Sequence, residues 1–279
     1  MLSAKQLTSI KKLQTLCEKE DSIQLKLNWD MLESRTQNEP HDYFKYEGEE
    51  LIAFLGLYGF GSKIELCGMV HPSYRRKGLF TQLVQKATDY AKSKGYRKIL
   101  LNYPLNSSSG EAFVNNIPHQ YEMTEYQMKW EEGSELQLSD PSVSLRPASE
   151  TDLTLEIQLD VQCFGFSEDD AVLYNQRIKE EDLQDFYIVE QNGVGVGKLR
   201  FSELEGDAWI YGFAVLPAYQ GKGIGRNALI QAVKLGSESG SSVYLEVEAK
   251  NERALSLYTS VGFQIIGAQA YVKYGNERE

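Results

Sequence analysis

Cysteine and histidine are scarce in this chain of 279 residues, which contains three of each. Cys17, Cys67 and Cys163 are scattered and form no C-x-x-C pair, and the three histidines lie far apart in the sequence. These spacings argue against a disulfide framework and against a metal site. They predict small buried thiols in a reducing compartment and no bound metal.

The chain also lacks a long apolar segment. Residues 1–20 carry charges throughout, which is unlike a signal peptide. The longest apolar run, Leu51–Phe60, contains two glycines and has about half the length that a membrane-spanning helix needs. From these absences we predict a cytoplasmic protein without a membrane partner.

An excess of positive charge is absent as well, since the formal net charge is −11. An acidic surface repels the phosphates of DNA and RNA, so we predict that nucleic acid is not a partner. The same charge is compatible with a cationic amine as substrate.

The chain does contain a degenerate internal repeat. Val70–Gly78 (VHPSYRRKG) aligns with Val215–Gly223 (VLPAYQGKG), with identical Val, Pro, Tyr, Lys and Gly, at an offset of 145 residues. Turn and linker residues collect between the two copies, at Glu131–Ser142. We predict two domains, residues 1–131 and 143–279, and the chain is long enough for two separate cores.

Apolar periodicity predicts alternating strands and helices, and therefore an α/β fold, in both halves. In the second half the expected strands are 143–146, 185–190, 194–202, 208–215, 243–247, 263–266 and 270–274, with helices at 151–163, 168–180, 223–237 and 252–260. In the first half the expected strands are 43–46, 51–58, 63–70 and 99–101, with helices at 4–17 and 79–93. The counterpart of strand 143–146 would lie before Met1. The first sheet should therefore be one strand short, or be completed by the other half.

The most informative segment is the turn that follows the expected strand 208–215. Glycines let the backbone approach a phosphate closely, and the first N–H groups of the next helix lack intrahelical partners. A lysine and an arginine add positive charge. A G-x-G turn alone also suits a plain strand–turn–helix connection, but the preceding Val-x-Pro-x-Tyr and strand favour a phosphate site. The predicted site consists of Gln220, Gly221, Lys222, Gly223, Ile224, Gly225 and Arg226.

A second segment contains Asn251-x-x-Ala254-x-x-x-Tyr258, followed by Gly262-Phe263. Together with the turn, it resembles the GCN5-related N-acetyltransferase superfamily. The resemblance covers nearly all of residues 143–275 and, in degenerate form, residues 1–131. It implies tandem domains of one fold, each a mixed, mostly antiparallel sheet that helices flank and in which one parallel strand pair splays apart.

The resemblance also implies how the co-substrate acetyl-CoA is held in this splay, between strands 208–215 and 243–247. Its pantetheine arm would form hydrogen bonds with the backbone at Phe213, Ala214 and Val215. Its diphosphate would accept hydrogen bonds from the backbone amides of Gly221 to Arg226. The Asn251 side chain would bond the pantetheine arm. A small-molecule or peptide amine would attack the thioester directly, without an acyl-enzyme.

Two side chains are the candidates for moving protons in such a reaction. Tyr258 matches the family's usual acid, and a phenol is protonated at neutral pH; its alternative role is a core aromatic. Glu246 lies at the spacing of the catalytic glutamate in the similar bacterial ribosomal-protein alanine acetyltransferases. It shares a strand face with Tyr244 and Glu248. Glu248 or a water chain could replace it as base, and a structural carboxylate is the alternative role of Glu246.

The same offset shows what the first half has lost. Gly225 corresponds to Phe80, Glu246 to Leu101 and Asn251 to Asn106, and we align Tyr258 with Pro118, with Tyr121 as an outside candidate. We therefore predict that residues 1–131 no longer catalyse, and instead pack against the active half, complete its cleft or hold CoA. A non-catalytic acyl-CoA sensor is the alternative function for the whole chain. The sequence does not identify the acceptor amine.

Overall fold

The computed structural model describes residues 2–35, 40–133, 136–180, 184–204 and 206–275. Contacts between Cα atoms divide the chain into two compact units, residues 1–125 with 267–279, and residues 126–266. Both divisions fall inside long strands. The predicted linker Glu131–Ser142 therefore belongs to the second unit, although residues 134–135 lie outside the described part. The ranges 1–131 and 143–279 remain a prediction that describes the two sequence repeats.

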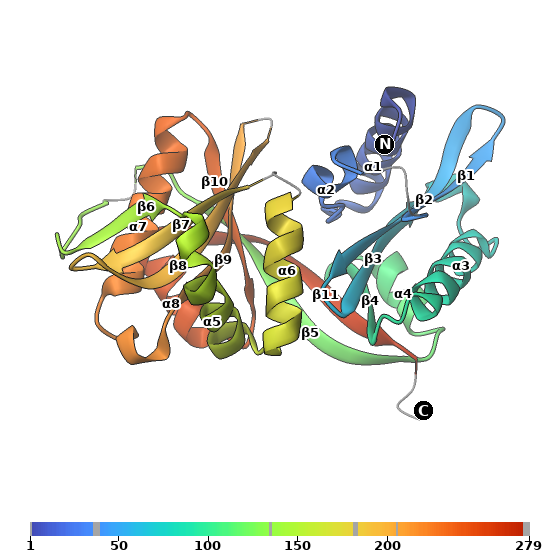
Figure 1. Ribbon diagram of the computed structural model, residues 1–279. Helices are drawn as coiled ribbons and strands as arrows, with labels where there is room; N and C mark the ends of the chain where they lie inside the picture. The colour runs from blue at the N-terminus through green and yellow to red at the C-terminus, as the bar shows by residue number, and fades with distance from the viewer. Residues whose placement is uncertain (1, 36–39, 134–135, 181–183, 205, 276–279) are drawn as a thin grey trace. The chain divides into compact units, whose positions relative to one another are not determined.

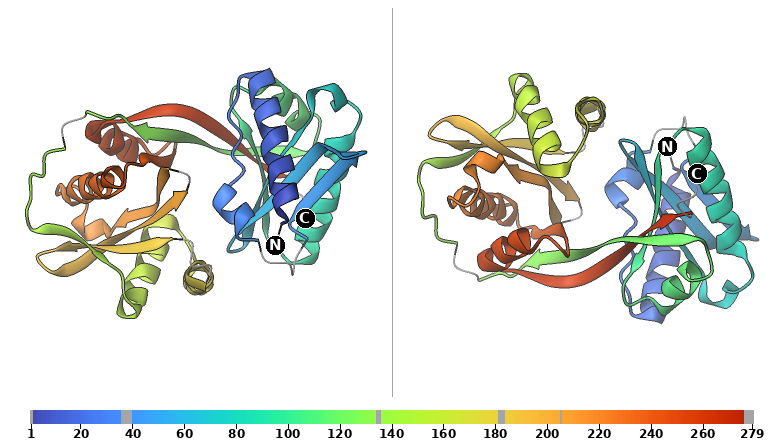
Figure 2. Two further views of the ribbon diagram at one scale, coloured as in Figure 1. Left: turned by 90° about the horizontal axis from the view of Figure 1, so that it is seen from above. Right: turned by 90° about the horizontal axis from the view of Figure 1, so that it is seen from below.

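The first unit is a sheet with helices on both faces (Figures 1 and 2). Its strand order is β1-β2-β3-β4-β11, in which only β3 and β4 among these neighbours run parallel. Alternate residues of β2 face opposite cores, because Leu55 and Leu57 pack with α3 whereas Phe54 and Tyr58 pack with α1. The elements are α1 (Ala4–Asp21), α2 (Trp29–Glu33), β1 (Asp42–Glu47), β2 (Glu50–Phe60), β3 (Lys63–Val70), α3 (Leu79–Ser93), β4 (Lys98–Pro104), α4 (Ser108–Val114) and β5 (His119–Trp130).

The second unit repeats this arrangement and adds an edge strand. Its strand order is β5-β10-β9-β8-β7-β6, with β9 and β10 parallel. One core joins α7 and α8 to one face of this sheet, and α5 contacts β8 and β9 on the other. The elements are β6 (Val143–Pro147), α5 (Leu153–Phe164), α6 (Glu168–Glu180), β7 (Asp185–Gln191), β8 (Val194–Leu204), β9 (Asp207–Val215), α7 (Ile224–Glu238), β10 (Ser242–Glu248), α8 (Glu252–Val261) and β11 (Phe263–Tyr274).

The two repeats differ at the outer edge of their sheets. In the second unit β6 pairs with β7, whereas β1, the counterpart of β7, is the last strand in the first unit's order. The predicted shortage of one strand is therefore confirmed for the described residues. A strand from the end of the chain also enters this sheet, since Gln269–Lys273 of β11 pair with β4. In the second unit, the neighbour of β10 is β5, which belongs to the first repeat by sequence.

The prediction of two closing strands, 263–266 and 270–274, was wrong. The structure has one continuous strand, β11, from Phe263 to Tyr274. Gly267 lies between the two predicted strands, but a glycine ends a strand only when its backbone turns, and here it lies inside the extended segment. The continuous strand passes from the second unit into the first at Ile266 and Gly267.

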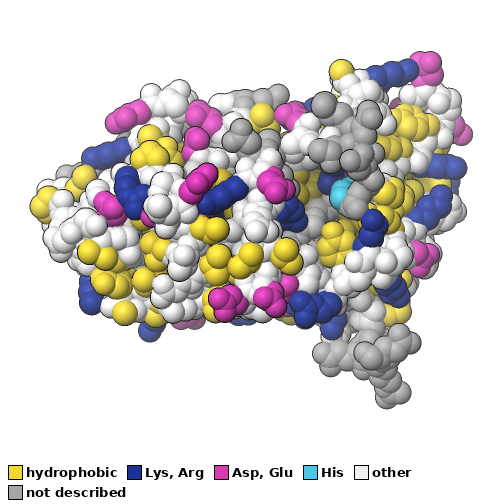
Figure 3. Space-filling view, viewed as in Figure 1, with side chains coloured by type: hydrophobic (Ala, Val, Ile, Leu, Met, Phe, Trp, Pro, Cys, Tyr) yellow, Lys and Arg dark blue, Asp and Glu magenta, His cyan; other side chains and the backbone are white. Residues whose placement is uncertain are grey.

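Two surface properties bear on the predictions about partners. None of the helices in the described part of the chain is long and apolar enough to cross a bilayer. On the face of the second unit that Figure 3 shows, acidic and basic side chains are interspersed. A surface of this kind presents no single-sign patch on that face.

Candidate active site

The two parallel strands of the second unit pair only over their first half. Their register runs from Asp207 opposite Ser242 to Ile210 opposite Leu245. Beyond these residues β9 continues to Val215 and β10 continues to Glu248. The strand ends that follow the paired region carry Phe213–Val215 and Glu246, so the predicted site residues of both strands lie in the part that is not paired in this register.

A β-bulge shapes the end of β9. Lys198 of β8 is opposite Ala214, and Arg200 is opposite Tyr211, so one residue of β8 faces both Gly212 and Phe213. Gly212 has a φ of +56°, which favours glycine. Sequence reasoning missed this bulge, and the signal for it was the single glycine inside an otherwise continuous strand. A bulge leaves the extra residue outside the ladder with β8, so its backbone is available to another partner.

A glycine turn joins β9 to α7. Gly221 and Gly223 both have left-handed backbone, with φ values of +74° and +80°. Gly223 is the N-cap of α7 and has no side chain to accept from the first-turn N–H groups of Ile224, Gly225 and Arg226. The turn therefore presents backbone donors at a helix N-terminus, the arrangement that binds anions.

The polar side chains of the turn have internal partners. Gln220 Nε2 donates to the Val215 carbonyl at 2.8 Å, so this side chain caps the end of β9. Lys222 Nζ donates to the Ala218 carbonyl at 2.9 Å. Arg226 reaches α8, where its guanidinium donates to the Ser260 carbonyl at 2.8 Å and to Ser260 Oγ at 2.6 Å. The side chains of Gln220 and Arg226 thus hold the turn against β9 and α8.

Gly225 marks the place where three elements of the site meet. A Cβ at this position would be 3.4 Å from Leu257 Cδ2 on α8 and 3.7 Å from Phe213 Cζ on β9. The first turn of α7 therefore lies against both the bulged strand and the helix that carries Tyr258. The structure brings together the two sequence blocks that lie more than twenty residues apart.

Tyr258 lies on α8 at the edge of the main core. It is 7% exposed and belongs to the cluster of Val247, Val261 and Phe263, with its ring centroid 6.2 Å from that of Phe263. Burial raises the pKa of the Tyr258 phenol to about 12. The phenol is therefore protonated at neutral pH, which suits a proton donor and not a base. Its packing also agrees with the alternative role as a core aromatic.

Glu246 lies on the opposite face of β10 from this core. Leu245 and Val247 are buried in the core with Tyr258, whereas Glu246 is half-buried and accepts from Gln127 Nε2 at 3.1 Å. Glu246 and Tyr258 thus approach the end of β10 from its two faces. The neighbouring candidate Glu248 forms an ion pair with Lys250 at 2.5 Å.

Asn251 has a structural role at the N-terminus of α8. It is the N-cap of this helix, and its Oδ1 accepts from the Ala254 N–H at 3.2 Å. The cap uses the carbonyl oxygen, and the side-chain amide also carries two N–H donors. The predicted contact with a pantetheine arm would therefore have to use the NH₂ group.

Aromatic rings line the Glu246 face of the sheet. Trp209 stacks on Tyr244, with ring centroids 5.0 Å apart, and on Tyr211 at 6.2 Å. Lys129 lies 5.3 Å from the Tyr244 ring centroid. On β8, the same face carries two buried cations, Lys198 and Arg200. Sequence reasoning missed these two residues, and the signal was a pair of basic residues at alternate positions of a strand.

The first unit keeps the backbone of the turn but pairs one of its cations, Arg75, with a carboxylate. Arg76, in the place of Gly221, has a φ of +61°, and Gly78, in the place of Gly223, has a φ of +74°. Arg75 Nε donates to the Val70 carbonyl at 3.1 Å, as Gln220 does to Val215. The Arg75 guanidinium also pairs with Asp21 at 2.8 Å. Its charge is therefore already matched within the unit.

The large ring of Phe80 does not spoil this turn, because a second change compensates for it. A Cβ on Gly68 of β3 would be 2.8 Å from Phe80 Cε2. In the second unit Phe213 occupies the strand position and Gly225 the helix position, so the ring and the glycine have exchanged places. One ring fills the same junction in both units, and it comes from the helix in the first and from the strand in the second.

The alignment of Tyr258 with Pro118 was wrong. A constant offset of 145 residues leads to Phe113, and Phe113 lies on α4, the counterpart of α8. Pro118 follows the end of α4 at Val114 and therefore cannot take the place of a helical residue. Phe113 packs edge-on against Phe80 with ring centroids 4.8 Å apart. Tyr121 is 67% exposed on β5.

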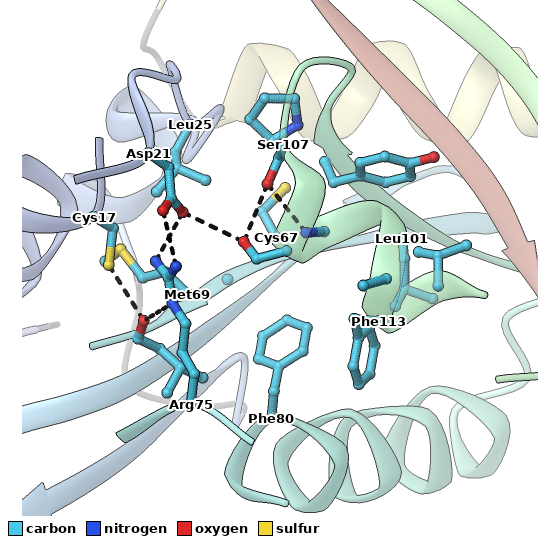
Figure 4. A pocket seen from close by; sticks show the side chains of 18 of the residues that line it. Cys17, Asp21, Leu25, Cys67, Met69, Arg75, Phe80, Leu101, Ser107 and Phe113 are labelled. Atoms are coloured by element: carbon cyan, nitrogen blue, oxygen red, sulfur yellow. Dashed lines mark hydrogen bonds and ion pairs between the residues drawn. The ribbon is translucent and has the colours of Figure 1, made fainter. Parts of the chain in front are cut away.

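A cavity of about 580 Å³ lies in the first unit where β3 and β4 continue beyond their last paired residues, Leu66 and Leu101 (Figure 4). The end of β3, the turn, the end of β4 and α4 all contribute to its lining, which includes Met69, Arg75, Phe80, Leu101 and Phe113. Figure 4 shows Phe80 and Phe113 side by side and the Arg75–Asp21 pair at some remove from them. The cavity has the size of a ligand pocket, but lacks a tyrosine or a carboxylate at the positions of Tyr258 and Glu246.

The structure gives no indication of a metal centre in the part of the chain that it describes. No group of three or more His, Cys, Asp or Glu side chains lies together there. Cys17 and Cys67 are buried free thiols and Cys163 is half-buried. Burial raises the pKa of Cys17 to about 11, so this thiol is protonated.

Comparisons with known proteins agree with this geometry. Two stretches of the chain, residues 7–109 and 153–263, match the acetyltransferase (GNAT) family. The N-alpha-acetyltransferase RimI of Mycobacterium tuberculosis is 48% identical over 58 residues, which cover 21% of this chain and 35% of that protein. The chain thus spans about a third of that relative.

Two further comparisons cover longer stretches. The spermidine N(1)-acetyltransferase of Escherichia coli is 31% identical over 144 residues, which cover 45% of this chain and 75% of that protein. The solved tandem GNAT protein from the clavulanic acid biosynthesis pathway has the same fold, with a TM-score of 0.70 and 13% identity over 99% of this chain and 98% of its own. The fold, the duplicated turn and the two family matches lead to one conclusion: the chain is a tandem member of the acetyltransferase (GNAT) family.

Proposed function

We propose that this chain transfers the acetyl group of acetyl-CoA to a primary amine, and that its second unit performs the reaction. The observation that carries the proposal is the meeting of three elements at Gly225. There the uncapped N-terminus of α7, the bulged end of β9 and the helix of Tyr258 lie in contact. An anion-binding turn thus lies beside a buried proton donor.

The roles of the chain's own groups follow from this arrangement. The amides of Gly221 to Arg226 would hold the diphosphate, and backbone at Phe213, Ala214 and Val215 would pair with the pantetheine arm. Asn251 would donate to the same arm through its side-chain NH₂. Acetyl-CoA supplies the activated acyl group as a thioester.

Two proton movements complete the proposal. The acceptor must be a neutral amine when its nitrogen forms the new bond to the acyl carbon, and Glu246 would take the proton that the nitrogen gives up. The carbon–sulfur bond breaks, and Tyr258 would donate its phenolic proton to the leaving thiolate. The pKa of about 12 keeps that proton in place until it is needed.

The features of the first unit support the assignment of catalysis to the second unit. It has a turn of the same backbone shape and a cavity beyond the paired part of β3 and β4, but Phe113 and Leu101 stand where Tyr258 and Glu246 stand in the second unit. The register between β2 and β3 also runs unbroken from Ala53 opposite Val70 to Phe60 opposite Lys63, without a bulge. We infer that the first unit does not catalyse.

The test is the release of free CoA thiol from acetyl-CoA in the presence of a panel of primary amines, which includes spermidine. We expect release that depends on the amine and that Gly223→Glu abolishes, because a carboxylate at the turn would oppose the diphosphate. Binding of acetyl-CoA without release for any amine would contradict the proposal and favour a non-catalytic acyl-CoA-binding module. Unchanged acetyl-CoA affinity in Gly223→Glu would refute the assignment of the turn.

A further inference from the structure

A buried guanidinium lies beside the bulge of β9 without a carboxylate partner. Arg200 on β8 is 8% exposed. Its two terminal nitrogens donate to neutral oxygens, Gln184 Oε1 at 3.0 Å and the Tyr174 hydroxyl at 2.9 Å. Its Nε is buried and has no hydrogen-bond partner. Two of the five N–H donors are therefore used, and no carboxylate in the described part of the chain pairs with this charge.

The neighbouring buried charges are already matched. Lys198 Nζ pairs with Asp160 at 2.7 Å, and Lys179 Nζ pairs with Glu156 at 2.5 Å. Burial, with a smaller effect of Arg200, lowers the pKa of Lys198. An unpaired cation in such surroundings is costly, because its lost hydration is not replaced by an anion. Among the described residues of this cluster, Arg200 is thus a buried cation whose hydrogen bonds go to neutral partners, and it could accept an external anion.

Arg200 and Glu246 lie on the same face of the sheet. Arg200 is opposite Tyr211 of β9, and Trp209 of β9 is opposite Tyr244 of β10. Glu246 follows Tyr244 by two residues, so its side chain shares that face of the sheet, just beyond the last residues of β9 and β10 that pair.

The guanidinium is also held next to the bulge. A Cβ on Gly212 would be 3.0 Å from both Arg200 Nε and one terminal nitrogen of Arg200. The missing side chain of Gly212 therefore leaves the space in which the guanidinium lies. A side chain at this position would require the guanidinium to shift by a few tenths of an ångström, so the glycine suits both the left-handed backbone and the position of Arg200.

We propose that Arg200 binds a carboxylate of the acceptor, which makes the acceptor an amine of the amino-acid type. The inference rests on the proposed function, because it assigns the acceptor of that same site. A guanidinium suits a carboxylate through two parallel N–H···O bonds. With its carboxylate at Arg200, a zwitterion extends over Tyr211 and directs its amine toward Glu246. Spermidine has no carboxylate, so the acceptor differs from that of the spermidine acetyltransferase relative.

The experiment compares amino acids with the amines that remain when the carboxylate is removed: lysine with cadaverine, and phenylalanine with phenylethylamine. The readout is the ratio of kcat/KM within each pair, measured by thiol release. Wild type should favour the amino acid, and Arg200→Gln should lower the ratio by about 10- to 100-fold, because a charged hydrogen-bond pair is lost. Comparing the ratio between variants cancels the different basicities of the two amines.

Two further variants separate binding from structure. Arg200→Lys keeps the positive charge but lacks the planar guanidinium that can donate two parallel hydrogen bonds. It should therefore lower the ratio less than Arg200→Gln does. Arg177→Gln is the matched control, because Arg177 also lies beside Tyr174, 5.6 Å from its ring centroid, and it should leave the ratio unchanged. Thermal melting identifies a variant that does not fold, and if Arg200→Gln fails, Arg200→Lys decides.

The outcomes are distinct from those that test the proposed function. A wild-type preference for cadaverine, phenylethylamine or spermidine would overturn the inference and leave amine acetylation intact. An equal loss for both members of each pair in Arg200→Gln would overturn it too, since that result indicates a structural role. If no amine is acetylated, calorimetry of lysine binding to the CoA-loaded protein tests Arg200 alone: binding that Arg200→Gln weakens at least tenfold supports the inference, and equal binding refutes it.

Discussion

Replacing Tyr258 by Phe is the sharpest test of which unit performs chemistry. The change removes one oxygen and keeps the ring, and the first unit already has a phenylalanine, Phe113, at the corresponding place. Tyr258 is 7% exposed and packs with Phe263, so the core should retain its contacts. We expect the free energy of unfolding to change by no more than about 1 kcal/mol.

The effect on the rate should be much larger. A positioned general acid contributes about 10²- to 10⁴-fold, which corresponds to roughly 2.7–5.4 kcal/mol of the barrier. Steady-state thiol release with saturating amine measures kcat, and calorimetry measures acetyl-CoA affinity. We expect kcat to fall within that range and the affinity to stay nearly the same, because the phenol acts on the leaving group and not on the diphosphate.

The pH dependence of kcat supplies an independent check. Burial disfavours the tyrosinate and raises the pKa of Tyr258 to about 12, so the proton is held as pH rises and is lost only near that value. Wild-type kcat should therefore show no loss from Tyr258 between pH 7 and 10. An alkaline fall of kcat near pH 9 that disappears in Tyr258→Phe would refute the argument from burial. Unaltered kcat in the variant would remove Tyr258 from the mechanism.

Two other predictions concern the base and the first unit. Glu246→Gln should lower kcat/KM about 10- to 100-fold at pH 7, and the deficit should shrink as the pH approaches the pKa of the amine, because more of the acceptor is then neutral; a deficit that stays constant with pH would argue for a structural role. Because the turn of the first unit keeps its backbone shape and a cavity lies beside it, calorimetry should find two equivalents of CoA per wild-type chain. Gly223→Glu and Gly78→Glu should each remove a different one. A single equivalent that Gly223→Glu abolishes would mean that the first cavity is closed to CoA.

Local features of the chain were predictable because neighbouring residues determine them. Both turn helices were expected at 79–93 and 223–237, and they run over Leu79–Ser93 and Ile224–Glu238. Apolar spacing specifies such a helix, and a glycine at its N-cap adopts left-handed backbone at little steric cost. The glycine turn at Gly221 and Gly223 was predictable for the same reason.

Features that depend on distant residues were not predictable in this way. Whether Gly267 breaks a strand depends on the pairing of the following residues with β4, more than 160 positions earlier. In the first unit Phe80 on the helix faces Gly68 on the strand, and in the second unit Phe213 on the strand faces Gly225 on the helix. This exchange is visible only in the structure, where strand and helix meet. From the sequence of the first repeat alone, Phe80 would be interpreted as a substitution that disrupts the turn.

The sequence by itself determined the family motifs, the duplication and the residues that could carry chemistry, because these depend on residue type and spacing along the chain. Only the tertiary structure decided which charged groups are paired with each other and which have neutral partners. Arg75 is matched by Asp21 and Lys198 by Asp160, whereas Arg200 is buried beside the bulge with neutral partners. The free energy of a charge depends on what surrounds it in space, and packing between distant segments sets those surroundings.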